Sequence, residues 1–345
     1  MDVGDFDYEL PLDRIAQAPA ASRDASRLLR IDRATGQLRD HVFHELPGLL
    51  TAGDLLVVND SRVIPARVFA RTTVSGADVE LLFVERVTDR RWRALVRPGR
   101  RCRPGAELIV GGEAAARLRV VAIEDDGTRT IEWPDGTIDD LLARHGLPPL
   151  PPYIERHAKP EAEDRERYQT VYGRVPGSVA APTAGLHVSA AVLAGLAARG
   201  IEVVALTLHV GPGTFRPIKA ARVEAHELPP ERVSITAATA AAVITARATG
   251  RRIVAVGTTV TRALEGVARA DGTVEPFVRR VGLYIHPGHH FRVVYVLVTN
   301  FHLPRSSLLV LASAFAGHEL TLRAYRHAIE TGYRFYSYGD ATLIV

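Results

Sequence analysis

The chain has 345 residues, 47% of them hydrophobic and 24% charged, a composition typical of a globular protein with a sizeable core. The formal net charge is only +4, and Lys159 and Lys219 are the only lysines among 43 basic residues, so a nucleic-acid partner is permitted but not required. The single cysteine, Cys102, excludes a disulfide framework and a cysteine-based zinc site. Since no apolar run approaches the length of a membrane span, we expect a cytoplasmic protein without membrane contact.

The first half of the chain passes from one buried strand to a series of short strands. Leu55–Asn59 is an apolar run that predicts a buried strand, closed by Asp60. From about Arg67 onward, short β-rich runs alternate with glycine turns. These runs are Val79–Val84, Trp92–Val96, Glu107–Val110, Arg117–Ile123 and Thr130–Trp133. Closely spaced short strands of this kind predict a small β-barrel or sandwich.

The second half alternates between helices and strands. It begins after a stiff connector, Leu147–Pro152, which has four prolines in six residues, and a charged, exposed stretch at Glu155–Arg167. The predicted helices are Ala190–Arg199, Ile235–Thr249, one starting at Thr258, Ser306–Phe315 and Leu320–Ile329. The predicted strands are Ile201–Val210, Ile253–Val256, Val281–Ile285 and Phe291–Val298. This alternation predicts a mixed α/β domain.

The segment Val175–Ser189 has neither a helical nor a strand period. Its prolines fix φ, its glycines permit positive φ, and its small residues let a backbone or a substrate approach closely. It ends in an imidazole, His187, and then in Ser189, which is a good N-cap for the following helix. The segment is interpreted either as an ordered crossover or as a site that delivers a histidine to a helix entrance.

Polar residues also follow the predicted strands of the second half. The strings are Leu208–Arg216, Gly257–Arg262 and Thr299–Arg305, and they carry histidines, threonines and an asparagine. Such residues at strand ends of an α/β sheet either cap and turn the chain or bind a ligand there. The sequence contains neither G-x-G-x-x-G after a strand nor G-x-x-x-x-G-K-[ST], so a Rossmann cofactor site and a P-loop are not expected.

Two further patterns have competing interpretations. His286-Pro-Gly-His289-His290 lacks the spacing of a known metal site and any nearby carboxylate, so we expect no metal. The stretch Arg90–Arg103 holds seven arginines and Trp92. This stretch is interpreted either as a solvated barrel edge or as a surface that follows a phosphate backbone.

Ten strings of the sequence, taken together and in order, carry a resemblance to a known family. They are Asp5–Pro11, Arg23–Leu29, Val58–Arg67, Pro149–Ile154, Tyr168–Tyr172, Pro176–His187, Leu208–Pro217, Gly257–Glu265, Leu297–Ser307 and Tyr333–Asp340. Over nearly its whole length the sequence resembles the S-adenosylmethionine:tRNA ribosyltransferase-isomerase family of queuosine biosynthesis. The resemblance implies a mixed α/β main domain, not a Rossmann fold, with a small antiparallel β-barrel inserted early in the chain.

We therefore expect a discontinuous α/β catalytic domain, residues 1–65 and 148–345, and an inserted barrel domain, residues 66–147. The resemblance implies that the ribosyl group of S-adenosylmethionine is transferred and isomerised onto the aminomethyl group of a 7-deazaguanine at the tRNA wobble position. Epoxyqueuosine-tRNA forms, and adenine and methionine leave. The partners implied are S-adenosylmethionine, as co-substrate, and tRNA; we expect no further cofactor and a monomer.

The reaction implied by the resemblance needs a base for a proton beside the sulfonium, a neutral amine and a proton for the departing adenine. The catalytic candidates at family-matching positions are His187, His209, His302, Asp60 and Glu231. His187 or His209 is expected to remove the proton, and Asp60 or Glu231 to serve the amine. Arg262, or Thr258 with Thr259, is expected to hold the methionine carboxylate. The remaining substrate-binding candidates are Arg67, Thr183, Gly185, Gly211, Gly213, Thr214 and Asn300.

The sequence departs from the family motifs at several positions within site-like segments. The departures are Val188, Pro229, Val281, Tyr295 and Thr342, and at Pro229 a histidine of the family pattern is absent. Three hypotheses follow. The chain is the tRNA enzyme itself, an S-adenosylmethionine-using relative that acts on another acceptor such as a small nucleoside, or a non-catalytic RNA-binding relative.

Overall fold

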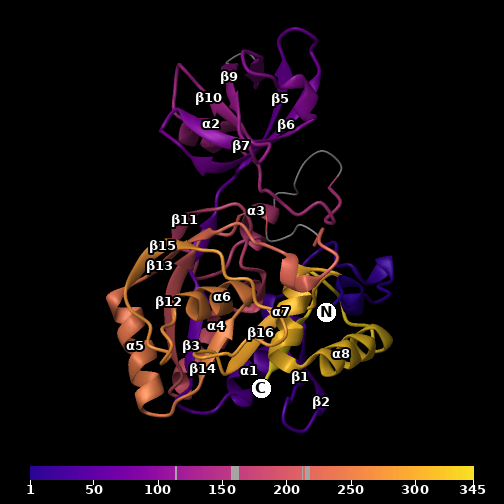
Figure 1. Ribbon diagram of the computed structural model, residues 1–345, viewed down its shortest axis with the longest axis vertical. Helices are drawn as coiled ribbons and strands as arrows, with labels where there is room; N and C mark the ends of the chain where they lie inside the picture. The colour runs from indigo at the N-terminus through magenta and orange to yellow at the C-terminus, as the bar shows by residue number, and fades with distance from the viewer. Residues whose placement is uncertain (113–114, 157–162, 212, 214–217) are drawn as a thin grey trace.

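The computed structural model describes residues 1–345 except 113–114, 157–162, 212 and 214–217. It has two parts, which Figure 1 shows one above the other. The lower part contains a nine-stranded sheet flanked by helices, and the upper part is a closed six-stranded barrel. The mixed α/β fold with an inserted barrel is therefore confirmed.

The large sheet has the strand order β15-β13-β12-β3-β14-β16-β17-β1-β2. Its strands are β1 (Arg27–Ile31), β2 (Leu38–Val42), β3 (Leu55–Asn59), β12 (Glu202–Leu208), β13 (Glu231–Ile235), β14 (Ile253–Val256), β15 (Phe277–Val281), β16 (Val296–Asn300) and β17 (Ala341–Ile344). The four central strands β12, β3, β14 and β16 are mutually parallel. The hairpin β1–β2 joins the sheet through β17, which pairs with β1 on one side and β16 on the other.

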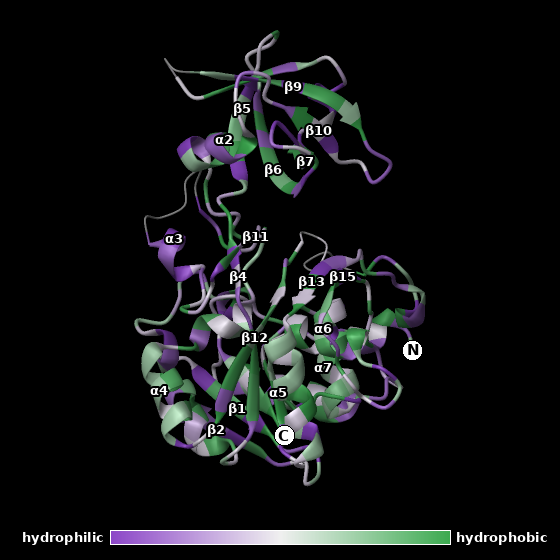
Figure 2. Cartoon of the chain, turned by 90° about the vertical axis from the view of Figure 1, so that its left-hand side faces the viewer, coloured by the Kyte–Doolittle hydropathy of each residue, from purple (hydrophilic) through white to green (hydrophobic). Residues whose placement is uncertain are grey.

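Helices cover both faces of this sheet because its central strands are apolar on both sides. In β3, Leu55 and Val57 face one core, whereas Leu56 and Val58 face the other. The first core is covered by α5 (Ala237–Ala248), α6 (Thr258–Val267), α7 (Ser307–Ala316) and α8 (His318–Glu330), and the second by α1 (Leu46–Leu49) and α4 (Ala190–Ala198). Figure 2 shows the apolar central strands between these helices.

Hydroxyl side chains begin several of these helices. Ser189 accepts a hydrogen bond from the backbone N–H of Val192, as expected for an N-cap of α4. Thr236 and Ser306 cap α5 and α7 in the same way. Ser306 lies a short loop after the end of β16, and its cap fixes where α7 starts.

The barrel is antiparallel throughout and has the order β10-β7-β6-β5-β8-β9, closed by the β9–β10 pair. Its strands are β5 (Arg67–Thr72), β6 (Asp78–Arg86), β7 (Arg91–Arg97), β8 (Glu107–Val110), β9 (Ala116–Ile123) and β10 (Arg129–Glu132). In β5, Val68 and Ala70 point inward and the alternate residues face out, the period of a half-buried strand. Helix α2 (Ile138–His145) packs Ile138 and Leu141 against the same core.

Several predicted elements need correction. The helix predicted from Ile235 begins at Ala237, because Ile235 ends β13. The strand predicted at Val281–Ile285 is wrong, since β15 ends at Val281. The strand predicted at Phe291–Val298 lies further along, at β16.

Other elements were not predicted at all. They are β1, β2, β5, β13, β17, α1, α2, α3 (Asp164–Arg167) and the short parallel pair of β4 (Ser61–Val63) with β11 (Val175–Ser178). Within the stretch predicted to be exposed, Asp164 is buried, because Arg156 binds its carboxylate at 3.0 Å and Tyr338 donates to it. Across the parts of the chain that the structure describes, no helix is long and apolar enough to cross a membrane.

Candidate active site

The carboxyl ends of the four parallel strands bring most of the candidate residues to one edge of the sheet. Strand β3 is followed by Asp60, β12 by His209 and β14 by Gly257, and β16 ends at Asn300. Because these strands are parallel neighbours, their ends lie side by side. This edge, named here the carboxyl edge, is where open α/β sheets bind their ligands.

The segment Val175–Ser189 lies across the carboxyl edge from one end to the other. Near its start, the hydroxyl of Ser178 accepts a hydrogen bond from the backbone N–H of Val210, at the end of β12, at 3.0 Å. Near its finish, His187 lies 3.1 Å from Asn300 of β16. The segment, predicted to be a crossover or a site, is thus a crossover that also lines the carboxyl edge.

His187 is buried, and both of its ring nitrogens are hydrogen-bonded. Nδ1 lies 2.8 Å from the hydroxyl of Ser26, and Nε2 lies 3.1 Å from the amide nitrogen of Asn300. The ring of Phe43 packs against the imidazole at 5.1 Å between centroids. Burial, followed by the charges of nearby arginines, lowers the pKa of His187 to about 3, so the ring is neutral.

Asn300 connects His187 to the chain that follows helix α8. Its amide nitrogen also donates to the carbonyl of Tyr336 at 3.0 Å, so both amide hydrogens are used. Its Oδ1 is buried and has no hydrogen-bond partner among the residues that the structure describes. A buried acceptor of this kind costs free energy unless a donor, such as a ligand, reaches it.

Asn300 also lines a pocket of about 160 Å³, named here the Asn300 pocket. Its lining residues are Tyr153, Thr183, Asn300, Phe301, His302, Leu303, Pro304, Ser306, Leu308, Tyr336 and Ser337. Two residues at this pocket have a positive φ, which residues other than glycine rarely adopt. They are Tyr336, with a φ of 73°, and Arg305, which follows the lining residue Pro304 and has a φ of 54°. Strained backbone of this kind gathers at ligand sites.

His302 is a second neutral histidine, on the wall of the Asn300 pocket. Its Nε2 lies 2.9 Å from the hydroxyl of Thr299, and its backbone N–H donates to the hydroxyl of Tyr325 at 3.0 Å. The hydroxyl of Tyr8 donates to its carbonyl. Burial lowers the pKa of His302 to about 3.

Asp60 and His209 form a separate group, at the ends of β3 and β12. The buried Asp60 carboxylate accepts hydrogen bonds from Thr207 at 2.6 Å and from Arg174 at 2.8 Å. Burial, followed by Arg232, lowers the pKa of His209, whereas Asp60 acts in the opposite direction. Nδ1 of His209 has no partner among the described residues.

Glu231 and Arg262 form a buried ion pair, with 2.7 Å between Oε2 and Nη1. The other Glu231 oxygen accepts the backbone N–H of Gly211 at 2.9 Å, and the guanidinium also donates to the carbonyl of Leu283 at 3.0 Å. The two residues were assigned to different parts of the substrate, but the structure brings them together as each other's partner.

Thr258 and Thr259 lie at the start of α6, which follows β14. Their place on the carboxyl edge is therefore between Asp60, after β3, and Asn300, at the end of β16. Both residues are buried, and the Oγ1 of Thr259 has no partner among the described residues. Gly257 precedes them with a φ of 97°, which a residue with a side chain rarely adopts. The first backbone N–H groups of α6 therefore point from a tight turn at the centre of the carboxyl edge.

The remaining candidates are distributed over the molecule. A Cβ at Gly185 would lie only 2.1 Å from the Tyr172 hydroxyl, so this glycine serves close packing. A Cβ at Gly213 would meet Pro229 at 3.1 Å. Thr214 lies outside the described residues. Arg67 is away from the carboxyl edge, on β5 of the barrel, where it contacts Glu80 and the carbonyl of Leu150.

Two site residues were missed, although they lie within the strings that matched the family. Ser26 contacts His187, and Ser337, whose hydroxyl lies 2.5 Å from that of Tyr153, lines the Asn300 pocket. The strings Arg23–Leu29 and Tyr333–Asp340 were the available signal.

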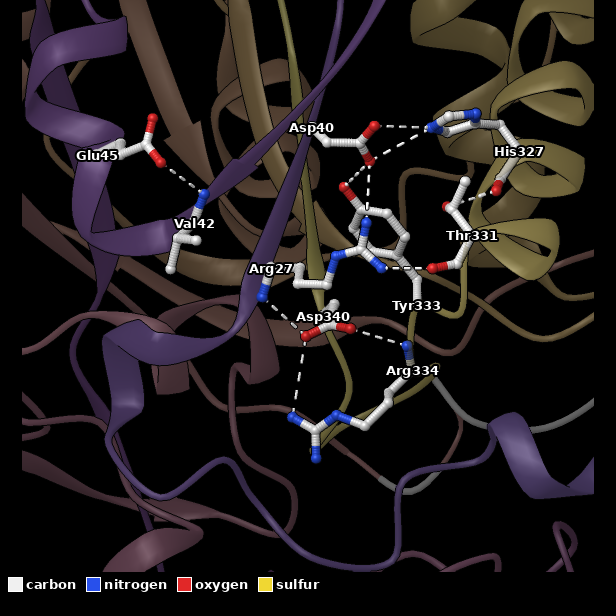
Figure 3. A network of polar contacts seen from close by, with 9 residues as sticks. All are labelled: Arg27, Asp40, Val42, Glu45, His327, Thr331, Tyr333, Arg334 and Asp340. Atoms are coloured by element: carbon white, nitrogen blue, oxygen red, sulfur yellow. Dashed lines mark hydrogen bonds and ion pairs between the residues drawn. The ribbon is translucent and has the colours of Figure 1, made fainter.

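A polar network holds the chain around Ser337 in place (Figure 3). The buried carboxylate of Asp340 accepts the backbone N–H groups of Arg27 and Arg334 at 2.9 and 2.8 Å. The Arg27 guanidinium lies 3.6 Å from the centroid of the Tyr333 ring. The network thereby fixes both ends of the turn that contributes Tyr336 to the pocket.

The five departures from the family motifs leave the Asn300 pocket intact, since none of them is among its lining residues. Val188 is fully buried in the core between the sheet and α4. Thr342 donates to the carbonyl of Thr299 at 3.1 Å, within the sheet. Pro229 packs beneath Gly213, Val281 ends β15, and Tyr295 is half exposed.

The fold and the carboxyl edge define an open α/β protein with a candidate ligand site at its strand ends and a barrel inserted early in the chain. A family described as "Queuosine biosynthesis protein" matches residues 3–344. The chain is 49% identical to the S-adenosylmethionine:tRNA ribosyltransferase-isomerase of Moorella thermoacetica over 346 residues, covering 100% of both chains. It is 50% identical to the protein of that name from Anaeromyxobacter dehalogenans, covering 100% of this chain and 99% of the other.

A crystal structure of an S-adenosylmethionine tRNA ribosyltransferase from Thermotoga maritima also matches, with a TM-score of 0.55 and 35% identity. The match covers 99% of this chain and 100% of that one. The chain belongs to the queuosine biosynthesis protein family.

Proposed function

We propose that this protein transfers and isomerises the ribosyl group of S-adenosylmethionine onto the aminomethyl group of a 7-aminomethyl-7-deazaguanine at the tRNA wobble position. With the amine neutral, the products are epoxyqueuosine-tRNA, adenine, methionine and one proton. The observation that carries the proposal is the full-length similarity to relatives that bear the name of this activity. This similarity does not favour the two alternatives, namely an enzyme that acts on another acceptor and a non-catalytic relative.

His209 is the histidine best suited to remove the proton beside the sulfonium. Its pKa is lowered by burial, so it is neutral near pH 7, and one ring nitrogen has no partner among the described residues. Neutral His187 and His302 have hydrogen-bonded rings, and we assign them to positioning. A general base must have a free nitrogen that reaches the proton it takes.

Asp60 is the carboxylate that we assign to the amine. It lies beside His209, where its charge stabilises the imidazolium that forms. Its partner Arg174 is 73% exposed and therefore free to move when substrate binds. Both oxygens of Glu231, by contrast, are taken by Arg262 and the backbone of Gly211, so we assign that pair to holding the strand ends together.

The methionine carboxylate is best matched by the start of α6. Arg262 already has a compensating charge in Glu231, whereas Thr258 and Thr259 offer backbone N–H groups at a helix N-terminus. The helix dipole favours a negative charge there.

For the tRNA partner, the barrel offers exposed arginines. Arg91 and Arg93 are paired with acidic side chains, but Arg100, Arg101 and Arg103 are exposed in the turn between β7 and β8. Exposed guanidinium groups bind phosphates in an ionic-strength-dependent manner. We propose that residues 66–147 form a domain inserted into the main domain, residues 1–65 and 148–345, and that its arginines contact the tRNA backbone. We expect a monomer, acting in the cytoplasm where tRNA is available.

The test is adenine release from S-adenosylmethionine by the purified protein, with tRNA carrying the aminomethyl deazaguanine or with the same tRNA carrying guanine. We expect stoichiometric release of adenine only with the modified tRNA. Release with a small nucleoside in place of tRNA would instead identify a different acceptor. Tight tRNA binding without any release would refute the enzymatic proposal.

A further inference from the structure

The Asn300 pocket has a composition that selects one part of the proposed substrate. Its walls are tyrosines, a phenylalanine, leucines and a proline, with a few hydroxyls, and none of the described residues that line it is an aspartate, glutamate, lysine or arginine. The one histidine on its wall, His302, is neutral. The pocket therefore favours a neutral, flat group and disfavours the sulfonium, the ammonium and the carboxylate of S-adenosylmethionine.

The size of the pocket also points to a fragment of that substrate. Its volume of about 160 Å³ is below the roughly 300–1,000 Å³ of sites that enclose a whole drug-sized ligand. It is equivalent to roughly five water molecules at about 30 Å³ each. Tyr153 and Tyr336 lie at its wall, with their ring centroids 4.7 Å apart, and offer aromatic surface to a planar base.

Among the described residues that line the pocket, Asn300 carries the one buried side-chain polar atom without a hydrogen-bond partner. Both amide hydrogens of Asn300 are donated, to His187 and to the carbonyl of Tyr336, so the orientation of the amide is fixed by its partners. Its Oδ1 is left with no partner in the described part of the chain, and the residue is 2% exposed. A ligand that brings an N–H donor here removes the cost of this buried acceptor.

We infer that the Asn300 pocket holds the adenine of S-adenosylmethionine, with Oδ1 of Asn300 accepting a hydrogen bond from the exocyclic N6 amino group. This inference rests on the proposed function and assigns the part of the substrate that becomes the leaving group. His187 acts as a positioning residue, because its Nε2 accepts from Asn300 and thereby keeps Oδ1 turned away from His187.

The position of the pocket fits the rest of the substrate. The pocket lies at the end of β16, and β14 alone separates β16 from β3, which is followed by Asp60. Two strand spacings of about 4.8 Å give roughly 10 Å between these ends. The ribose then lies beside the start of α6, between the adenine pocket and the group of Asp60 and His209.

The first test compares S-adenosylmethionine with its deaminated analogue S-inosylmethionine, which carries an oxygen in place of the N6 amino group. Binding to the wild-type protein is measured by calorimetry without tRNA, so that no turnover occurs. We expect the inosyl compound to bind roughly 10–100-fold more weakly, since an acceptor would then face an acceptor. Equal affinities would overturn the inference and leave the proposed function standing, whereas no binding of S-adenosylmethionine either to the free protein or in the presence of the tRNA carrying guanine would refute the proposed function itself.

The second test asks whether Asn300 is the residue that distinguishes S-adenosylmethionine from S-inosylmethionine. The variant Asn300→Ser lacks Oδ1. We expect its affinity for S-adenosylmethionine to fall nearly to the wild-type affinity for S-inosylmethionine. Its affinity for S-inosylmethionine should change less than threefold. A merely structural role would weaken both compounds equally and would overturn the assignment.

The third test does not depend on Asn300. Leu308→Trp puts a large side chain on the half-buried wall of the pocket, and we expect at least a tenfold loss of S-adenosylmethionine affinity. Leu193→Trp, at an equally half-buried leucine on α4 that lines a different surface, is the matched control and should bind as the wild type does. Equal affinities of the two folded variants would overturn the placement of adenine.

Discussion

The histidines of the carboxyl edge differ in what their ring nitrogens contact. His187 and His302 are buried and neutral, and each makes a short hydrogen bond to a hydroxyl. His209 is half-buried beside a carboxylate. The same residue type therefore has two physical roles here, and these roles respond differently to mutation and to pH.

The first prediction concerns catalysis by His209. His209→Gln keeps a polar side chain of similar length but removes the basic nitrogen, so we expect kcat for adenine release to fall roughly 10²–10⁴-fold. Affinity for S-adenosylmethionine should change less than threefold. A kcat within a factor of three of wild type, measured with saturating modified tRNA, would exclude His209 as the base.

The second prediction concerns pH and stability at His302. Its pKa is about 3 in the folded protein and 6.5 in the unfolded chain, so between these values the unfolded state binds more protons. Stability contributed by the neutral ring is therefore present above pH 6.5 and is lost as pH falls toward 3, by about 1.4 kcal/mol per pH unit. The variant His302→Gln has no imidazole at this position, so it should not show this part of the fall in unfolding free energy at low pH.

The measurement is urea unfolding of both proteins at a series of pH values between about 7 and 4.5. We expect the variant to lose roughly 2–3 kcal/mol less than wild type over this range. His44→Gln, at an exposed histidine, is the matched control and should keep the wild-type slope. Parallel slopes for wild type and His302→Gln would contradict the neutral, buried state of this ring.

At the level of elements, the carboxylate of Glu265 holds the segment that leads into β16. Glu265 on α6 is buried and accepts three backbone N–H groups, from Arg292, Val293 and Val294, at 2.8–2.9 Å. Although burial opposes it, these hydrogen bonds, with His289, hold the pKa of Glu265 below its usual value. Residues 292–294, part of the segment predicted as strand, are thus held by a side chain, and the first backbone hydrogen bond to a strand is that from Tyr295 to the carbonyl of Ile253 on β14.

The third prediction follows from this contact. Glu265→Gln replaces one acceptor oxygen by a donor facing a backbone N–H, and we expect a loss of about 2–3 kcal/mol in unfolding free energy. Glu275→Gln removes an exposed ion pair with Arg269 and should cost less than about 0.5 kcal/mol. A difference between the two variants below about 1 kcal/mol in urea unfolding would contradict the anchoring role.

The elements also show what local sequence determines. Leu55–Asn59 and Ile253–Val256 were predicted with the bounds observed, because an apolar run bounded by polar turns needs no partner to be recognised. β17 was missed, because its place between β1 and β16 depends on pairing across the whole chain. β15 was misplaced because Val278, Arg279 and Arg280 are exposed, so the strand shows no buried pattern and is defined by its pairing with β13.

The same division applies to the site. The rule that parallel strands end in ligand-binding turns pointed to the strings that contain His209 and Asn300, whereas Asp60 was selected because its position matches the family. It did not show that Glu231 would pair with Arg262, because the partner of a charged side chain depends on three-dimensional proximity. Nor could it show that His187 is closed off by two hydrogen bonds.

At the level of the whole molecule, the barrel lies apart from the large sheet (Figure 1), and Arg100 and Arg101 are exposed on it. The fourth prediction is that Arg100→Gln combined with Arg101→Gln weakens tRNA binding and lowers the dependence of log Kd on log salt by about 1–2. Arg91→Gln combined with Arg93→Gln changes the net charge equally but removes arginines that are already paired with acids.

Binding is measured by fluorescence anisotropy at several salt concentrations. The control pair should keep the wild-type slope. If both double variants reduce the slope equally, the barrel acts only through net charge, and the proposed contact is wrong.

The place of β17 between β1 and β16 has a consequence for biosynthesis. The hairpin β1–β2 emerges from the ribosome early, yet among the strands that the structure describes it joins the large sheet through β17, which is translated long afterwards. Until then one edge of β1 has no partner, and such an edge is prone to pair with other chains. A nascent polypeptide of this design thus depends on late synthesis to protect its earliest strands.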